Sequence, residues 1–290
     1  MRRRDLLLAA WAPVERSVLV HEHVLVNFTG ASYDRAEAYR VALPKLNELL
    51  QYGCRRLQEC TPNFIGRDPE LLRRLSGATG LEIWTNTGLY GAVNHKYVPA
   101  YAVQESAAQL AKRWEAEFHS ELRPRFIKIG VNNAPLDPID RKLVEAAALA
   151  SNSTGLTIAS HTGGRGPAAL EQLEILSKLR CPAARFVWVH AQNEKDHALH
   201  EQVARAGAWV EFDGISERTS DWHLECVQWM QEKGLVNRVL LSQDSGWYRP
   251  GEPDGGEYRG YTYIYTDFLP KLSEPARRTL METNPRKAFG

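Results

Sequence analysis

Cysteine and long apolar runs are both scarce in this sequence of 290 residues. The four cysteines, Cys54, Cys60, Cys181 and Cys226, are too few and too scattered for a disulfide framework, and no two form a CxxC pair. No apolar run approaches the roughly 18 residues that a membrane-spanning helix needs. These absences predict a protein of a reducing compartment, the cytoplasm, with no membrane as partner.

Neither sign of charge prevails. Lysine and arginine number 36, aspartate and glutamate 35, and the formal net charge is +1. A balance this even gives no reason to expect nucleic acid or an anionic membrane as partner. It leaves a small molecule as the expected partner, and one with an anionic group stays compatible with local charge.

The amino terminus carries the one targeting signal. Arg2, Arg3 and Arg4 precede an apolar stretch over 6–13, a pattern that resembles the start of a twin-arginine export signal. The stretch is short for a signal core plus a cleavage site. Residues 1–17 are therefore interpreted as a tail or the remnant of a leader, with export of a longer precursor as the alternative.

Strand-like and helix-like segments alternate along the rest of the chain. Short β-branched or apolar runs occur at 18–23, 55–61, 82–90, 126–131, 156–162, 186–192, 208–215 and 239–245. Helical spacing of apolar residues occurs at 41–52, 102–118, 139–151, 167–179, 197–206, 221–233 and 275–282. Alternation of this kind predicts βαβ units and a parallel sheet. Eight strands match a (β/α)8 TIM barrel, here a single α/β domain over 18–290, and a doubly wound open sheet is the alternative.

Potential metal ligands stand near the carboxyl ends of five of these strands. They are His21 and His23 at the end of the first strand, Lys128 in the fourth, His161 in the fifth, His190 in the sixth and Asp244 in the eighth. The carboxyl ends of barrel strands meet at one mouth, where the active sites of such enzymes lie. Each residue taken alone is more often a core histidine, a surface histidine or a turn residue. The combination predicts a metal site.

The types of these ligands favour particular metals. Residues two apart in a strand point to the same side, so His21 and His23 are expected to face the barrel interior while Glu22 faces the helices. Imidazole nitrogen with carboxylate oxygen suits Zn²⁺, with Mn²⁺, Co²⁺ or Fe²⁺ as substitutes. Lys128 leaves two interpretations open: a lysine that extends to the barrel rim, or a neutral amine that has added carbon dioxide.

The ordered motifs His-x-His, Phe-Ile-Lys-Ile, Ser-His-Thr, Val-His-Ala and Ser-Gln-Asp together resemble the phosphotriesterase family of the amidohydrolase superfamily, from residue 18 to 290. Further segments that carry the resemblance are Glu-Cys-Thr-Pro at 59–62, Asn-Thr-Gly-Leu-Tyr at 86–90 and Asn-Pro-Arg at 284–286.

This resemblance implies two metal ions. His21, His23 and Asp244 would hold the buried ion, and His161 and His190 the more exposed one. A carbamate on Lys128, formed with carbon dioxide, and a hydroxide would bridge them. Asp244 would then take the proton of the attacking hydroxide. The resemblance also implies a homodimer.

Two positions depart from the pattern of true phosphotriesterases. An aspartate and a histidine that relay the proton outward in those enzymes are replaced here by Asn193 and Gly214. An arginine that lactonases of the family often carry at the position of Gly214 is absent too. Metal binding is unaffected by these departures, but the substrate and the proton route are not settled by the resemblance.

The last βα loop and one tyrosine are the candidate substrate residues. Trp247, Tyr248, Arg249 and Arg259 could form a lid whose aromatic rings wall the pocket and whose arginine clamps an anionic group. A solvated surface loop is the alternative. Tyr90, at the end of the third strand, is a candidate to hydrogen-bond the oxygen of the scissile group, or else a packing residue.

The sequence thus predicts a binuclear zinc-dependent hydrolase that opens a lactone or cleaves a related carboxylic ester, with hydrolysis of phosphotriesters as a side activity. Asp244 and Tyr90 are its expected catalytic residues. An organophosphate triester hydrolase is the first alternative, and a non-catalytic barrel that binds a metabolite is the second. A metal-dependent nuclease or amidase of the same superfamily is a further alternative. The nuclease is disfavoured by the balanced charge and because superfamily members that cut DNA carry a glutamate where Lys128 stands.

Overall fold

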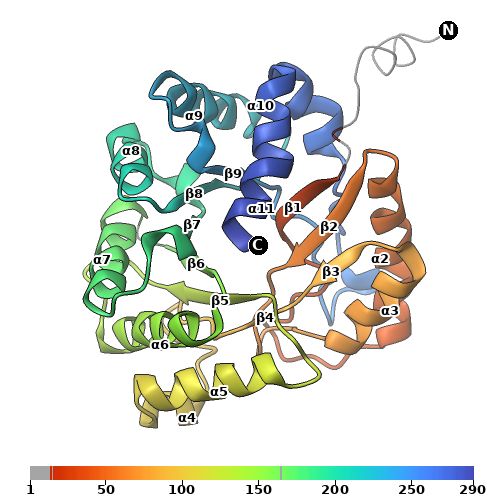
Figure 1. Ribbon diagram of the computed structural model, residues 1–290. Helices are drawn as coiled ribbons and strands as arrows, with labels where there is room; N and C mark the ends of the chain where they lie inside the picture. Colours follow the sequence, from red (N-terminus) through yellow and green to blue (C-terminus); the bar gives the residue numbers. More distant parts are fainter. Residues whose placement is uncertain (1–13, 15, 164) are drawn as a thin grey trace, which may run out of the picture.

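The computed structural model describes residues 14, 16–163 and 165–290, and shows a ring of parallel strands surrounded by helices (Figure 1). One sheet contains β1 (Ser17–Glu22), β2 (Cys54–Glu59) and β3 (Glu82–Trp84). The other contains β4 (Asn86–Thr87), β5 (Phe126–Val131), β6 (Ile158–Thr162), β7 (Phe186–Val189), β8 (Trp209–Phe212) and β9 (Val239–Leu241). Adjacent strands in each sheet are parallel.

Backbone hydrogen bonds join the two sheets. β3 and β4 form one barrel strand interrupted at Thr85, whose carbonyl accepts from the N–H of Arg125 at 2.9 Å. On the other side, the N–H of Asp244, just after β9, donates to the carbonyl of His21 at 3.1 Å. With β3 and β4 counted as one, eight barrel strands result, and the predicted (β/α)8 barrel is confirmed.

Ten α-helices in the described residues surround the barrel. They are α2 (Arg35–Leu50), α3 (Pro69–Thr79), α4 (Ala100–Gln104), α5 (Ala107–His119), α6 (Pro138–Thr154), α7 (Arg165–Lys178), α8 (His197–Arg205), α9 (Ser220–Glu232), α10 (Glu274–Arg278) and α11 (Asn284–Phe289). Short 3₁₀ turns lie at Ala183–Arg185, Ala191–Asn193, Val236–Arg238, Pro253–Gly255 and Leu269–Lys271, and π turns at Ile264–Phe268 and Thr279–Thr283. None of the described helices is long and apolar enough to cross a membrane.

Two helix predictions need correction. No helix was expected between 61 and 82, but α3 forms there because Asp68 caps it by accepting from the N–H of Leu71, and Pro69 follows in the first turn. The single helix expected at 102–118 is divided into α4 and α5. Ser106 and Gln109 form a reciprocal capping box that starts α5 afresh.

Side chains fill the ring, so that it has a packed interior rather than a pore. Val18, Phe126, Val187 and Leu240, from four different strands, belong to one interior cluster. At the amino ends of the strands, α11 lies across the barrel (Figure 1). Its Phe289 belongs to this cluster, and the centre of its ring lies 5.9 Å from that of Phe126. A larger cluster packs the outer faces of the strands against the helices. The opposite end of the barrel, at the carboxyl ends of the strands, is left for the pocket.

The amino-terminal segment lies mostly outside the described residues. Of the tail expected at 1–17, residues 1–13 and 15 lie outside the described residues. β1 begins at Ser17, one residue before the expected start of the barrel domain.

Candidate active site

All six residues predicted as metal ligands line one pocket at the carboxyl ends of the strands: His21, His23, Lys128, His161, His190 and Asp244. They come from β1, β5, β6, β7 and β9 or from the residues that directly follow these strands. Each of these five strands is separated from the next contributing strand by more than 20 residues of sequence, so only closure of the barrel brings the six side chains together. The sequence positions and the geometry therefore agree on where a site lies.

The side chains of β1 do not alternate strictly between the inside and the outside of the barrel. Val18 and Val20 both belong to the interior cluster, yet His21, the next residue, also faces inward, where its ring contacts Glu211. The pairing of β1 with β2 shifts register between Leu19 and Glu22, which explains the change. Glu22 turns instead towards the residues after β9, where its carboxylate accepts from the N–H groups of Gln243 and Ser245.

One ligand group consists of His21, His23 and Asp244. The Oδ1 atom of Asp244 lies 3.1 Å from Nε2 of His23 and 3.9 Å from Nε2 of His21. This oxygen is buried and has no hydrogen-bond partner among the described residues. Burial opposes ionisation, but the attraction of His23 and His21 holds the pKa of Asp244 well below its usual range. An ionised, unpartnered oxygen beside two ring nitrogens fits a divalent cation.

A second group consists of His161, His190 and Lys128. Nδ1 of His161 lies 2.8 Å from Nε2 of His190, and the two rings meet edge to face. Burial, then repulsion by His190 and Lys128, lowers the pKa of His161 well below its usual range, so that its ring is neutral and able to ligate. Lys128 is 2% exposed, and its amine makes no hydrogen bond or ion pair with any described residue. A buried amine without a partner fits the carbamate interpretation better than a lysine that extends to the rim.

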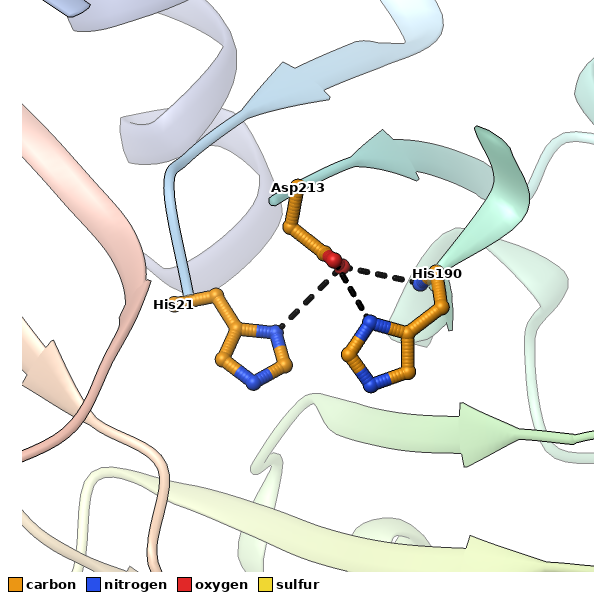
Figure 2. A group of neighbouring side chains, drawn as sticks. All are labelled: His21, His190 and Asp213. Carbon is orange, nitrogen blue, oxygen red and sulfur yellow. Dashed lines mark hydrogen bonds and ion pairs between the residues drawn. The ribbon is translucent and has the colours of Figure 1, made fainter. Parts of the chain in front are cut away.

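Asp213 and Glu211 orient two of the histidines, and the sequence-based prediction missed both. Figure 2 shows Asp213 between His21 and His190. Its Oδ1 lies 2.5 Å from Nδ1 of His190, and its Oδ2 accepts from the N–H of the same residue at 2.9 Å. Nδ1 of His21 lies 2.7 Å from Oε1 of Glu211. Since these contacts occupy the Nδ1 atoms, the Nε2 atoms of both rings are left for the pocket.

The signal for these two carboxylates was present in the strand at 208–215. Glu211 and Asp213 are two residues apart and therefore on one face, next to Trp209 and Phe212. Two acidic residues on one face of an otherwise apolar strand require buried partners. His23 has a comparable support in Thr61, whose Oγ1 lies 2.7 Å from Nδ1 of His23 and 2.5 Å from Oε1 of Glu59.

Two ligand residues have unusual backbone conformations. His190 has φ 63° and Asp244 has φ 50°, both in the left-handed region that non-glycine residues rarely adopt. His190 comes directly after β7, and Asp244 follows the last residue of β9, Leu241, in the loop that leaves the barrel. Such conformations persist when surrounding contacts fix them, and they often occur at functional sites.

Tyr90 lies at the pocket as expected. Its hydroxyl is 3.3 Å from Nε2 of His161, and its side chain lines the pocket. Burial, with a contribution from Asp244, raises the pKa of Tyr90 well above its usual range. The hydroxyl therefore stays protonated and remains a hydrogen-bond donor.

The last βα loop contributes one of its four candidate residues to the pocket. Trp247 lines it, with its ring 5.0 Å from that of His23. Gly246 holds this loop against β1: it has φ 95°, and a Cβ atom there would overlap the carbonyl oxygen of His23.

The other three candidates, Tyr248, Arg249 and Arg259, do not line the pocket. Arg249 pairs with Glu252 at 3.3 Å, and Arg259 donates to the carbonyl oxygens of Gln243 and Asp244. The expected arginine clamp is thus absent from this pocket. Apolar and aromatic side chains form its remaining wall: Val26, Phe28, Pro62, Ile65 and Trp247, with Cys60 beside them.

The positions that depart from the phosphotriesterase relay are next in sequence to two residues that contact each other, Gln192 and Asp213. Gln192 holds that carboxylate from outside: its Nε2 donates to Oδ1 of Asp213 at 2.9 Å, and its Oε1 accepts from the N–H of Asp213 at 3.1 Å. Asn193 and Gly214 have no side chain in the pocket. The outer side of Asp213 is therefore closed by an amide that cannot carry a proton as a histidine does.

Comparison with known proteins agrees with this geometry. The model of the phosphotriesterase family matches residues 12–289. The chain belongs to the phosphotriesterase family. The phosphotriesterase homology protein of Escherichia coli K12 is 28% identical over 287 residues, which cover 93% of this chain and 97% of that protein.

Two further relatives differ in their named activities. The aryldialkylphosphatase of Saccharolobus solfataricus is 22% identical over 302 residues, which cover 93% of this chain and 94% of that one. The crystal structure of a mutant of the Deinococcus radiodurans phosphotriesterase-like lactonase superposes with a TM-score of 0.82 at 26% identity, covering 97% of this chain and 98% of the other. Members of this family thus include hydrolases of phosphotriesters and of lactones.

Proposed function

We propose that this member of the phosphotriesterase family is a binuclear metal-dependent hydrolase that opens lactones or cleaves related carboxylic esters. The observation that carries the proposal is the convergence of the six ligand residues on one pocket whose remaining wall is apolar. A non-catalytic barrel would have no need of an unpartnered buried amine and an unpartnered buried carboxylate oxygen at the same place.

The donor set fits two divalent cations, with zinc preferred for its imidazole and carboxylate ligands. His21, His23 and Asp244 would hold one, His161 and His190 the other, and a carbamate on Lys128 would be shared between them. When bound, such a pair supplies Lewis-acid activation of the substrate oxygen and of the attacking water.

The residues of the chain divide the remaining work. Asp244, ionised at neutral pH, accepts the proton of the attacking water at its carboxylate. Tyr90, held protonated by its surroundings, donates a hydrogen bond to the oxygen on which negative charge develops. Asp213 and Glu211 keep the rings of His190 and His21 in the orientation that ligation requires.

The wall of the pocket indicates a neutral substrate with an apolar substituent. Phe28, Ile65 and Trp247 provide surface for such a group. Apart from Lys128 and the histidines, no cationic side chain of the described part of the chain lines the pocket, so an anionic substrate would lack a partner there. A lactone with an alkyl or acyl chain meets both conditions.

An organophosphate triester is the second candidate, because it too is neutral and one relative is named an aryldialkylphosphatase. The lactone is preferred since Asn193 and Gly214 replace the relay of true phosphotriesterases. Zinc, carboxylation of Lys128 and a homodimer belong to the same proposal by family resemblance.

A substrate panel tests the preference. Sugar lactones, acyl-homoserine lactones and paraoxon are offered to the metal-loaded protein, with Lys128→Ala as the control for activity that does not come from this site. We expect the highest kcat/KM for lactones that carry an apolar chain, and a weak activity on paraoxon. Hydrolysis of paraoxon alone would contradict the preference for lactones.

A further inference from the structure

A second pocket lies outside the barrel, between α3, the interrupted strand β3–β4 and the segment before β5. It is lined by Pro69, Leu72, Arg73, Ser76, Ile83, Trp84, Thr85, Leu122, Arg123 and Arg125, and is called here the arginine pocket. Arg125 directly precedes the first residue of β5, so the pocket lies towards the amino end of that strand, whereas the hydrolytic pocket lies at the carboxyl ends. None of its lining residues contributes to the hydrolytic site.

Positive charge in the arginine pocket is not neutralised by the protein. Among the residues that the structure describes, no acidic side chain lines it. The guanidinium groups of Arg73, Arg123 and Arg125 are exposed and make no hydrogen bond or ion pair with a described side chain, so they are free to bind an anion from solvent. The exposed Glu82, next to the lining residue Ile83, is already paired with Arg56 at 3.0 Å.

The aromatic wall of the pocket is covered by cations as well. Arg56 lies 3.5 Å and Arg125 4.6 Å from the ring centre of Trp84. Burial lowers the pKa of Arg56, against the opposing effect of Glu82, and repulsion from Arg125 adds to the lowering. Since both guanidinium groups already contact this ring, Trp84 fixes their position rather than offering a face to a ligand.

Polar groups without partners line or adjoin the pocket. The hydroxyl of Thr85, at the interruption between β3 and β4, is buried without a hydrogen-bond partner among the described residues. Nη1 of Arg56, whose guanidinium lies over the ring of Trp84, is also buried without a hydrogen-bond partner among the described residues. An unsatisfied buried hydroxyl in a cationic pocket is explained by a ligand that accepts its hydrogen bond.

We propose that the arginine pocket binds the phosphate group of a small anion. The planar guanidinium fork matches the oxygens of phosphate, and a dianion balances three cations better than a single carboxylate does. Bound phosphate joins α3, through Arg73, to the segment before β5, through Arg123 and Arg125. It therefore stabilises the barrel at the place where its third strand is interrupted.

Titration calorimetry with inorganic phosphate, at constant ionic strength set by chloride, tests the proposal. The variant Arg73→Gln/Arg123→Gln removes two exposed cations, and Arg74→Gln, one residue along α3 and outside the lining, is the matched control. The hydrolytic pocket is unchanged in both variants, so phosphate bound there contributes equally. We expect wild type and Arg74→Gln to show a saturable event that weakens at least about tenfold in the double variant.

A second variant tests the hydroxyl. Thr85→Val keeps the shape of the side chain and removes its donor, and we expect phosphate to bind about tenfold more weakly to it. Titration with glycerol 1-phosphate then separates the two sources of the group: tighter binding of the ester indicates a phosphorylated metabolite, and equal binding indicates free phosphate. Equal binding by wild type and double variant, no saturable event in wild type, or wild-type affinity in Thr85→Val would each overturn the proposal.

Discussion

The carboxylate of Asp213 bridges two histidines from distant strands: one oxygen lies 2.5 Å from Nδ1 of His190 and the other 3.5 Å from Nδ1 of His21. Asp213 therefore connects the two proposed ligand groups, because His21 belongs to the first and His190 to the second. Burial opposes its ionisation, but His190 and His21 hold the pKa of Asp213 well below its usual range. Asp213, in turn, raises the pKa of His190 against the opposing effect of burial.

Replacing Asp213 should weaken metal binding by both proposed ligand groups, because one residue of each group depends on it for orientation. Asp213→Asn keeps the shape of the side chain but removes its charge, and we expect metal affinity to fall about 10- to 100-fold. Competition with a chelator measures this affinity. Asp221→Asn, which changes a fully exposed carboxylate, is the control and should leave it unchanged. Equal metal affinity in Asp213→Asn and Asp221→Asn would contradict the orienting role.

Lys128 should make metal loading depend on carbon dioxide. Because the carbamate forms only from a neutral amine and carbon dioxide, the metal-free protein should regain activity faster when bicarbonate is supplied with the metal. Lys128→Arg keeps a long side chain, but its guanidinium stays protonated and does not form the carbamate, so this variant should lose activity about 100-fold or more with no response to bicarbonate. Recovery of wild-type activity by this variant would show that Lys128 is not a bridging ligand.

Phe28 should set the preference for apolar substituents. Phe28→Ala removes part of the wall of the pocket, and we expect KM for a lactone with a long alkyl chain to rise roughly tenfold through lost apolar contact. A lactone with a short chain should be affected much less. Arg249→Ala is the control, since Arg249 lies outside the pocket and should change neither KM. A larger rise in KM for Arg249→Ala than for Phe28→Ala would contradict this account and would favour the arginine clamp expected from the sequence.

A half-buried ion pair next to the third strand should contribute to stability at neutral pH. Both Nη atoms of Arg67 donate to the carboxylate of Glu117 at 2.8 Å, and the Arg67 side chain is 7% exposed. Breaking this pair with Glu117→Gln should lower the free energy of unfolding by about 2 kcal/mol, measured by urea denaturation. Glu115→Gln, on the same helix, is the control.

The same pair predicts how stability changes with pH. Burial raises the pKa of Glu117, but Arg67 and Thr87 outweigh it and lower the net value below the usual 4.5. A carboxyl group with a lowered pKa in the folded state stabilises the protein above its unfolded value and loses this contribution as the pH falls. The difference between wild type and Glu117→Gln should therefore shrink below about pH 4. A difference that stayed constant down to pH 3 would contradict this assignment.

The barrel and the ligand positions were predictable because each depends on local sequence. Strands buried on both faces appear as apolar runs, and a barrel brings their carboxyl ends together, so His161 and His190 could be placed without coordinates. Glu211 and Asp213 were missed because their partners come from other strands. Nothing near position 211 indicates a histidine at position 21.

In the loop after β9, the sequence predicted pocket residues that the structure places elsewhere. Arg249 and Arg259 have the right residue type near the pocket, but their direction depends on contacts within the loop, with Glu252 and with backbone carbonyls. Sequence composition does not reveal such contacts. The helix α3 could have been predicted, since Asp68 and Pro69 are a standard start signal before Leu71, Leu72 and Leu75.

Stepwise reconstitution of the metal-free protein with zinc tests the central claim most directly. Metal bound per chain and hydrolysis of an alkyl-chain lactone are measured on the same samples. A site built from His21, His23, His161, His190, Asp244 and carboxylated Lys128 predicts activity that reaches its maximum only when two ions are bound per chain. Full activity without metal, or with one ion per chain, would contradict it.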